Sequence, residues 1–160
     1  MNLNLQNQLK KILNGRFSQS ESTRANYARG EDTYDPVLSQ AVVFPETNEE
    51  VSQILKLCNE NKVPVVPFGT GTSLEGHAVG NDKGITISLE KMNKVLVVNT
   101  EDFDCRVQAC VTREQLNEYL REDGVFFPID PGANAAIGGM ASTSASGTMA
   151  VKYGTMKSVI

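Results

Sequence analysis

The 160-residue sequence has no tryptophan, one histidine and three cysteines, and these shortages exclude several kinds of site. An odd number of cysteines without a C-x-x-C pair argues against a disulfide framework. We interpret Cys58, Cys105 and Cys110 as small buried residues in a reducing compartment, the last two on opposite faces of one strand. With one histidine and no Cys/His/Asp cluster, no metal site is expected.

Long apolar runs and clustered basic residues are also missing. No run reaches the length of a membrane span, and lysine and arginine are scattered while the net charge is −4. Neither a membrane span nor a nucleic-acid partner is therefore expected. The N-terminus shows no signal core or Arg/Ser-rich presequence, which favours a cytoplasmic protein.

The first 66 residues contain patterns that predict short helices and strands in alternation. The apolar spacing predicts a helix over residues 3–13, and residues 14–40 are expected to be irregular and extended. Apolar runs at 41–44 and 63–66 predict two buried strands. A capping box at Thr47 and a helical period between the runs make a βαβ unit, with parallel strands and a right-handed crossover.

The chain after residue 80 has a different rhythm. A second capping box at Thr112 predicts a helix that stops at Asp123-Gly124. Residues near Ile160 have the composition of the start of another strand. Three further strands separated by short turns are expected at Gly84–Leu89, Lys94–Val98 and Cys105–Val111.

The stretch Pro67–His77 combines three glycines with three hydroxyl side chains directly after a predicted strand. Glycine allows backbone N–H groups to approach an anion, so the loop is a candidate phosphate cradle at the carboxyl end of a strand. No amphipathic helix follows, as a Rossmann motif would need, and no Gly-Lys-Ser/Thr follows, as a Walker motif would need. A flexible surface connection remains the alternative.

A second glycine-rich and hydroxyl-rich region lies at residues 131–155. Gly138-Gly139 precedes a short predicted helix, so free N–H groups are expected to face an anion there as well. Two such regions suit a long ligand with a diphosphate and a ring system. Helix capping is the alternative role for Ser142, Thr143 and Ser144.

Five motifs occur in a fixed order, namely PFGTGTSLEG at 67–76, FPIDPG at 127–132, IGGMA at 137–141, ASGT at 145–148 and YGT at 153–155. They resemble the FAD-binding domain of the vanillyl-alcohol oxidase/p-cresol methylhydroxylase (PCMH-type) superfamily, and within it the D-lactate dehydrogenase (cytochrome)/glycolate oxidase branch. The resemblance runs from about Tyr27 to Ile160.

The resemblance implies an α+β (mixed α/β) fold of two lobes, a βαβ lobe followed by a mixed or antiparallel lobe. It divides the chain into an N-terminal helix and arm, residues 1–36, and a PCMH-type domain, residues 37–160. That domain is expected to be truncated at its C-terminus, with a cap domain absent.

The resemblance also implies that FAD is bound, non-covalently, by backbone groups and hydroxyls of the motifs. His77 does not match a covalent attachment motif and is interpreted as a turn or solvent residue. Asn134 and Ser144 stand where many relatives carry Asp and Asn. The implied FAD-binding residues are Pro67, Gly69, Thr70, Gly71, Thr72, Ser73, Leu74, Pro131, Gly132, Gly138, Gly139, Met140, Thr143, Ser146 and Gly147.

The function implied by the resemblance is oxidation of a D-2-hydroxy acid (D-lactate or glycolate), with hydride passing to FAD and electrons to cytochrome c, a quinone or another acceptor. No catalytic residue is expected in this chain, because Glu75 and Asp130 are better interpreted as a loop charge and a turn former. The branch also places such proteins beside a membrane respiratory chain. A non-catalytic flavin- or nucleotide-binding module, a different PCMH-type oxidase and a structural domain remain alternatives.

Overall fold

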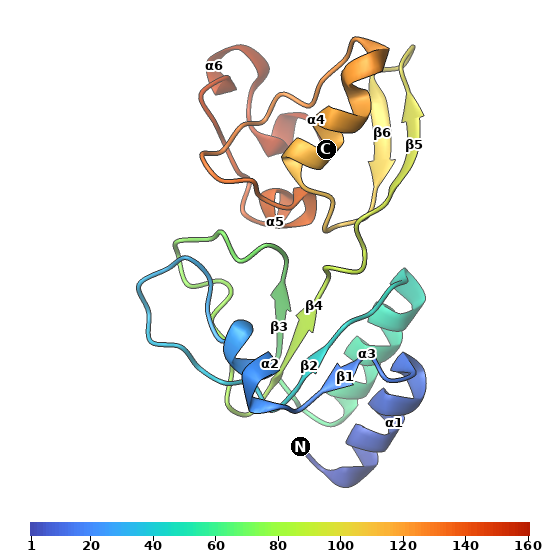
Figure 1. Ribbon diagram of the computed structural model, residues 1–160, viewed down its shortest axis with the longest axis vertical. Coiled ribbons are helices and arrows are strands. Elements are labelled where there is room, and N and C mark those ends of the chain that lie inside the picture. Colours follow the sequence, from blue (N-terminus) through green and yellow to red (C-terminus); the bar gives the residue numbers. More distant parts are fainter. The chain divides into compact units, whose positions relative to one another are not determined.

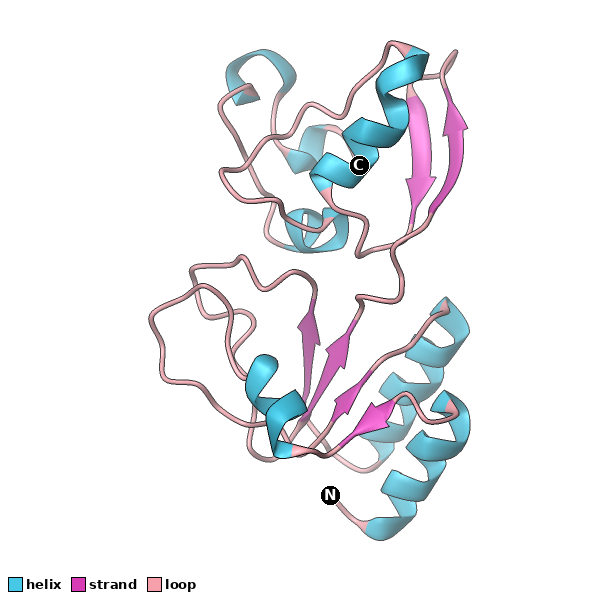
Figure 2. Cartoon of the chain, in the orientation of Figure 1, coloured by secondary structure: helices cyan, strands magenta, loops and turns pink.

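The computed structural model describes residues 1–160, which form two compact units, Met1–Lys91 and Met92–Ile160. Each unit is described by itself. The first is a four-stranded sheet with helices, and the second is a two-stranded sheet with helices and long loops (Figures 1 and 2). The boundary predicted at residues 36/37 stays a prediction.

The sheet of the first unit has the strand order β1-β2-β4-β3. Strand β1 pairs antiparallel with β2, whereas β2, β4 and β3 are parallel. The predicted parallel arrangement is therefore confirmed, with β4 lying between the two strands of the βαβ unit. The bounds of the strands are Phe17–Ser18 (β1), Val42–Val43 (β2), Val65–Phe68 (β3) and Ile85–Ser88 (β4).

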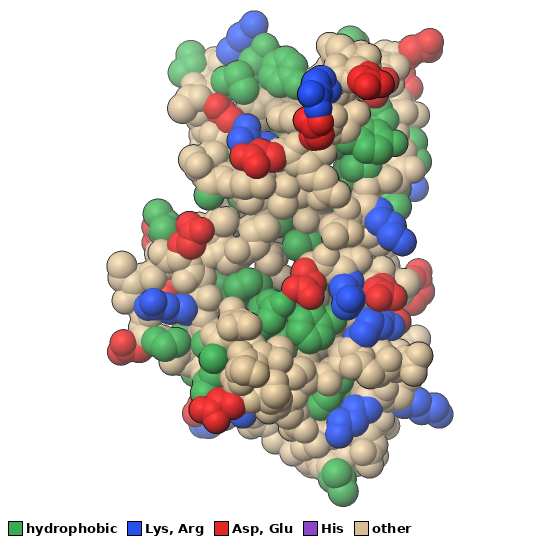
Figure 3. Space-filling view, viewed as in Figure 1, with side chains coloured by type: hydrophobic (Ala, Val, Ile, Leu, Met, Phe, Trp, Pro, Cys, Tyr) green, Lys and Arg blue, Asp and Glu red, His purple; other side chains and the backbone are tan.

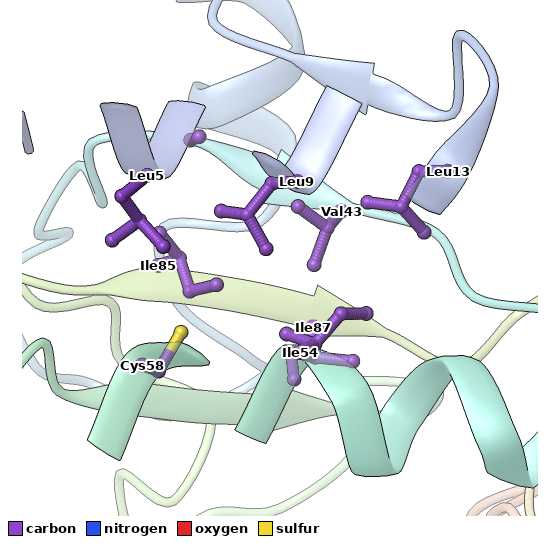
Figure 4. Close-up of a cluster of buried hydrophobic side chains, with 9 residues drawn as sticks. Leu5, Leu9, Leu13, Val43, Ile54, Cys58, Ile85 and Ile87 are labelled. Atoms are coloured by element: carbon purple, nitrogen blue, oxygen red, sulfur yellow. The ribbon is translucent and has the colours of Figure 1, made fainter. Parts of the chain in front are cut away.

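Two helices, α1 (Leu3–Leu13) and α3 (Asn48–Glu60), share one hydrophobic core with the sheet. Figure 4 shows their apolar side chains meeting those of the strands. Burial of each large aliphatic side chain stabilises the fold by roughly 1.5–3 kcal/mol. Both helices were predicted, and the core side chains in the figure are Leu5, Leu9, Leu13, Val43, Ile54, Cys58, Ile85 and Ile87.

Helix α3 begins at the predicted cap. The Thr47 hydroxyl oxygen accepts a hydrogen bond from the backbone N–H of Glu50 at 3.1 Å. The Glu50 carboxylate is held by two guanidinium nitrogens of Arg16 at 2.5 and 2.7 Å. This bidentate pair joins the turn before β1 to the first turn of α3. Such a pair is stronger than a single surface contact.

The segment 14–40 is more structured than its sequence predicts. It contains strand β1 and a short helix, α2 (Glu21–Asn26). The helix has no buried residue and begins at Ser20, whose hydroxyl oxygen accepts a hydrogen bond from the N–H of Thr23 at 3.2 Å. An apolar period could not reveal it, because it has none.

The second unit contains β5 (Val95–Asn99) and β6 (Asp104–Val107), paired antiparallel as predicted. Helix α4 (Arg113–Leu120) continues as the 3-10 turn η1 (Arg121–Asp123) and ends at Gly124 in a left-handed conformation. The remaining helical pieces are short. They are α5 (Ile137–Ser142), α6 (Ala150–Tyr153) and the 3-10 turn η2 (Met156–Ser158).

Three predictions for the second unit were wrong. The strand expected at Cys105–Val111 ends at Val107, so Cys110 lies outside it and the two cysteines do not mark its two faces. Cys105 is exposed rather than buried. The strand expected near Ile160 is the turn η2, because Met156 folds back into the core beside Met140.

Cys58 behaves as expected of a buried thiol, since burial raises its pKa to about 11. None of the helices combines the length and apolar character that crossing a membrane requires. The visible face carries acidic and basic side chains interspersed with one another (Figure 3).

Candidate functional site

The loop Gly69–Gly80 leaves the carboxyl end of β3, beside the parallel strand β4 (Figure 2). In open sheets with parallel strands, ligands bind at this end, where the strands deliver their following loops to one edge. The loop contains bends and turns but no helix or strand. The absence of a helix after the glycines is as predicted.

Several backbone donors in this loop have no partner within the chain. A backbone N–H that lacks a partner in the protein must be satisfied by water or by a ligand. Successive free N–H groups make a concave surface that favours an anion. Four of the N–H groups that donate no hydrogen bond within the chain, those of Gly69, Gly71, Thr72 and Ser73, lie within five consecutive residues.

Hydroxyl groups lie beside these donors. The Thr70 and Thr72 oxygens are 3.4 Å apart, and the Ser73 oxygen lies 2.7 Å from Nδ1 of His77. Each hydroxyl can donate one hydrogen bond to a phosphate oxygen. Thr72 and Ser73 are half-buried while Thr70 is exposed. The loop therefore offers hydroxyl and N–H donors together, which is the donor set that a diphosphate requires.

Gly71 needs the absence of a side chain for two reasons. Its φ is +73°, a left-handed conformation, and an added Cβ would lie 2.7 Å from Cζ of Phe68. The loop thus passes directly over an aromatic ring at the end of β3. Tyr27 packs edge-to-face against this Phe68 ring, with ring centroids 5.0 Å apart. The Tyr27 ring in turn packs edge-to-face against Phe44, at 5.6 Å.

Hydrophobic side chains gather on this face of the first unit, over β3 and β4 (Figure 3). The hydroxyl of Tyr27 donates a hydrogen bond to the Glu90 carboxylate, so its polar end is satisfied. Sequence patterns did not indicate that Tyr27 supports the loop, because it lies 40 residues before Pro67 in a segment predicted to be irregular. An isolated aromatic in a polar segment was the only available signal.

The two ends of the predicted contact stretch differ in character. Pro67 is exposed on β3, which is an edge strand of its sheet. Leu74 is 67% exposed. The side chains of both residues border the four N–H donors. Their assignment to the cofactor stays a prediction.

In the second unit, Asp130 joins two of the predicted motifs. Its carboxylate accepts hydrogen bonds from the Thr148 hydroxyl and from the N–H of Met149, the latter at 3.1 Å. The Thr148 bond, helped by Met149, lowers the pKa of Asp130. A Cβ on Gly147 would lie 2.5 Å from the Asp130 carbonyl carbon, so these backbones touch. Pro131-Gly132 and Ser146-Gly147 are thereby brought together.

The expected free donors at Gly138-Gly139 are only partly present. Both glycines lie inside the first turn of α5 rather than before it. The N–H of Gly138 donates to the Ala109 carbonyl oxygen at 2.8 Å, and that of Ile137 donates to Val111 at 2.8 Å. The expectation of a free N–H is therefore wrong for Gly138, whose missing side chain instead allows close packing on Ala109.

Two of the glycines predicted to contact FAD in this unit remain open to an approaching group. An added Cβ on Gly132 or Gly139 would meet no atom within 4 Å. The other predicted residues of α5 are used internally. Met140 is buried in the core, and the Thr143 hydroxyl donates to the Gly139 carbonyl oxygen at 3.1 Å. The Thr143 bond closes the C-terminal end of the helix.

The positions noted as departures have local explanations. Ser144 has φ +50°, a left-handed conformation that asparagine adopts more readily than serine. The side-chain oxygen of Asn134 accepts a hydrogen bond from the N–H of Glu114 at 3.1 Å, which caps the start of α4. An aspartate could make the same bond. Asparagine at Ser144 and aspartate at Asn134 would therefore suit the backbone of this chain.

Comparison with curated proteins finds relatives over most of the chain. It is 47% identical over 140 residues to a probable mitochondrial D-lactate dehydrogenase of Danio rerio, covering 88% of this chain and 28% of that protein. It is 43% identical over 152 residues to the mitochondrial D-lactate dehydrogenase [cytochrome] of Arabidopsis thaliana, covering 94% and 27%. The chain thus spans little more than a quarter of these relatives' length.

Solved structures share the fold at lower identity. An alkyldihydroxyacetonephosphate synthase superposes with a TM-score of 0.89 at 22% identity, covering 98% of this chain and 32% of that one. A p-cresol methylhydroxylase superposes with a TM-score of 0.64 at 22% identity, covering 81% and 26%. These likenesses show the PCMH-type fold that the motifs predicted.

A comparison with protein-family models gives a result consistent with these relatives. A model described as an FAD binding domain matches residues 39–160, three quarters of the chain. The matched range includes the loop after β3 and the motifs of the second unit. The chain therefore belongs to the family of FAD binding domains.

Proposed function

We propose that this chain is the FAD-binding part of a flavoprotein oxidoreductase that oxidises a D-2-hydroxy acid, with D-lactate and glycolate as the first candidates. The names of the relatives support the substrate class. The observation that carries the proposal is the set of unpartnered N–H groups of Gly69, Gly71, Thr72 and Ser73. They lie at the carboxyl end of the parallel strands β3 and β4, in a chain of an FAD-binding family.

In this proposal the loop after β3 holds the FAD diphosphate. Its N–H groups and the Thr72 and Ser73 hydroxyls donate to the phosphate oxygens, while Gly71 lets the backbone approach closely. Bound FAD supplies the hydride acceptor that protein side chains lack. The FAD contacts expected at Pro131, Gly132 and Gly139 stay predictions. In this proposal FAD is held non-covalently, and His77 serves the loop through its hydrogen bond with Ser73.

The acidic residues near these segments are not suited to be the catalytic base. Glu75 is an exposed loop residue, and the Asp130 carboxylate is occupied by Thr148 and Met149. We therefore place proton abstraction and substrate binding in a cap domain outside these 160 residues. Electrons then pass to cytochrome c, a quinone or another acceptor. The cytoplasmic location, beside a membrane respiratory chain, stays a prediction.

The experiment has two parts. Purified chain is titrated with FAD and followed by flavin absorbance and fluorescence quenching, and saturable one-to-one binding is expected. The form of the protein that includes a cap domain, or the chain with its partner, is then mixed anaerobically with D-lactate, L-lactate and glycolate. Bleaching of the flavin by a D-2-hydroxy acid supports the proposal. FAD binding without bleaching by any of them would favour a binding module instead.

A further inference from the structure

We infer that Asp32 is a positioning residue for the glycine loop, acting through a tight turn at Gly30–Tyr34 that fixes the shape of the loop before the cofactor arrives. This inference rests on the proposed role of the loop in FAD binding. It concerns a segment that precedes the loop by some 40 residues and lies outside the range of the matched family model. Nothing in the sequence motifs points to it.

Asp32 is an unusual buried carboxylate. Its side chain is only 6% exposed, although aspartate is rarely buried without a reason. One carboxylate oxygen accepts a hydrogen bond from the N–H of Gly30 and the other accepts from the N–H of Tyr34, each at 3.0 Å. The two bonds hold both ends of the turn to one side chain. Charge-assisted bonds of this kind are stronger than those between neutral groups.

The turn touches the loop at both of its left-handed glycines. The N–H of Glu31 donates to the Gly71 carbonyl oxygen at 2.8 Å, and a Cβ on Gly30 would lie 2.3 Å from that oxygen. The ring of Tyr34 lies against Gly76, where an added Cβ would be 2.8 Å away. These two glycines have φ values of +73° and +74°. The turn therefore contacts the loop at both Gly71 and Gly76.

The segment after the loop is tied to the same region. The Ala28 carbonyl oxygen accepts hydrogen bonds from the N–H of Val37 at 3.1 Å and from that of Gly80 at 2.9 Å. The Ser39 hydroxyl oxygen accepts a bond from the N–H of Asn81 at 3.0 Å. Both ends of the loop are thus fixed, and the turn held by Asp32 supports its middle.

The direction of the Gly71 carbonyl group links the Gly30–Tyr34 turn to ligand binding by the loop. The N–H of Glu31 donates its hydrogen bond to the Gly71 carbonyl oxygen, so this oxygen is held toward the turn. The neighbouring N–H groups of Thr72 and Ser73 then remain available to an anion. Without the turn, the peptide after Gly71 could rotate and present its carbonyl oxygen to the phosphates, where it would repel them.

The test compares Asp32→Asn with Asp35→Asn in the full chain. Asparagine has the shape of aspartate but only one acceptor oxygen, so one N–H of the turn loses its partner. Asp35 is exposed and lies next to the same turn, which makes it a matched control. Three quantities are measured: the Kd for FAD, the Kd for riboflavin, which has no phosphate, and amide hydrogen exchange of residues 69–76 without cofactor.

The expected result is a loss of FAD affinity by roughly tenfold in Asp32→Asn, the effect of one lost charge-assisted bond. Riboflavin affinity should be unchanged, exchange at 69–76 faster and exchange at β4 unaltered. A general loss of stability would instead change exchange at β4 and both affinities together. If Asp32→Asn does not fold, Gly30→Ala tests the same contact, because its Cβ would displace the Gly71 carbonyl.

Two outcomes overturn the inference. Unchanged FAD affinity in a folded Asp32→Asn or Gly30→Ala variant refutes it, and so does an equal loss in Asp35→Asn. Failure of the proposed function gives a different pattern, in which the unaltered chain itself binds FAD no more tightly than riboflavin. The two failures are therefore distinguishable in one set of titrations.

Discussion

Arg16 and Glu50 lie 34 residues apart and meet in a bidentate ion pair at the first turn of α3. The arginine holds the pKa of Glu50 at about 2, well below its ordinary value. The folded state therefore gains stability while the carboxylate is charged. This gain is complete above the pKa of the unfolded chain, about 4.5, and is lost as the pH falls toward 2.

We expect Glu50→Gln to lower the free energy of unfolding by about 1–2 kcal/mol at pH 7, after allowing for solvent screening of a partly exposed pair. The difference from the unaltered chain should vanish near pH 2. Urea unfolding at several pH values measures it. Glu49→Gln is the control, because Glu49 lies in the same helical turn but is exposed. An equal effect of both variants would show that the helix dipole, not Arg16, is responsible.

Gly71→Val is expected to reduce FAD affinity by tenfold or more (about 1.4 kcal/mol or more) while the fold survives. Valine would strain a left-handed residue and press on the Phe68 ring. Gly124→Val imposes the same strain, since its φ is +70°, but its Cβ would meet nothing within 4 Å. Titration of both variants with FAD separates the two effects. Unchanged flavin content in Gly71→Val would refute the proposal that this loop binds the FAD diphosphate.

Asp130→Asn should loosen the backbone at residues 146–149. The carboxylate that accepts from Thr148 and Met149 has a lowered pKa, so its bonds are present above the ordinary pKa of an aspartate and weaken as the pH falls below it. Faster amide exchange at Met149 is expected in the variant at neutral pH, and in the unaltered chain only in acid. Asp123→Asn, at an exposed position in η1, should leave this exchange unchanged.

His77 provides a test of how FAD is attached. Acid precipitation is expected to release all flavin from the protein, and His77→Ala should weaken FAD binding by less than about tenfold, since it removes one exposed hydrogen bond to Ser73. Mass spectrometry of the precipitated protein decides the matter. A flavin adduct present in the unaltered chain and missing from His77→Ala would mean covalent linkage.

Ser144→Asn is expected to stabilise the second unit. Asparagine tolerates the left-handed conformation found at this position, and the gain should be roughly 0.5–1 kcal/mol. Thermal unfolding measures the change. Ser142→Asn is the contrasting variant, because Ser142 belongs to helix α5 and its hydroxyl bonds the Gly138 carbonyl oxygen. A gain in Ser142→Asn of the same size would contradict the conformational explanation.

Local signals in the sequence predicted those elements that local physics determines. Helix α1 has the predicted bounds because its apolar period is visible in the sequence, and α3 starts at its capping threonine. Strand β1 could not be predicted, since two residues form a strand only through pairing with Val42–Val43. Helix α2 has a cap but no apolar face, so nothing distinguished it from a polar loop.

The same division applies to the candidate site. The glycine pattern predicted a loop with free donors, and the donors between Gly69 and Ser73 are there. What the pattern could not reveal is why the loop holds its shape. Tyr27, Gly30 and Asp32 act on it across 40 residues of chain, and such contacts exist only after folding. At Gly138 the pattern misled, because packing on Ala109 also demands a glycine.

Pro67 has a consequence for association between molecules. The N–H of Ile85 bonds the Pro64 carbonyl and the N–H of Leu89 bonds that of Phe68, so by the two-residue alternation of a strand the nitrogen of Pro67 points away from β4. At that point β3, an edge strand, has no donor to offer an incoming strand. The residue that leads into the loop therefore also removes one hydrogen-bond donor from the border of the sheet, which makes pairing with a second strand there less favourable.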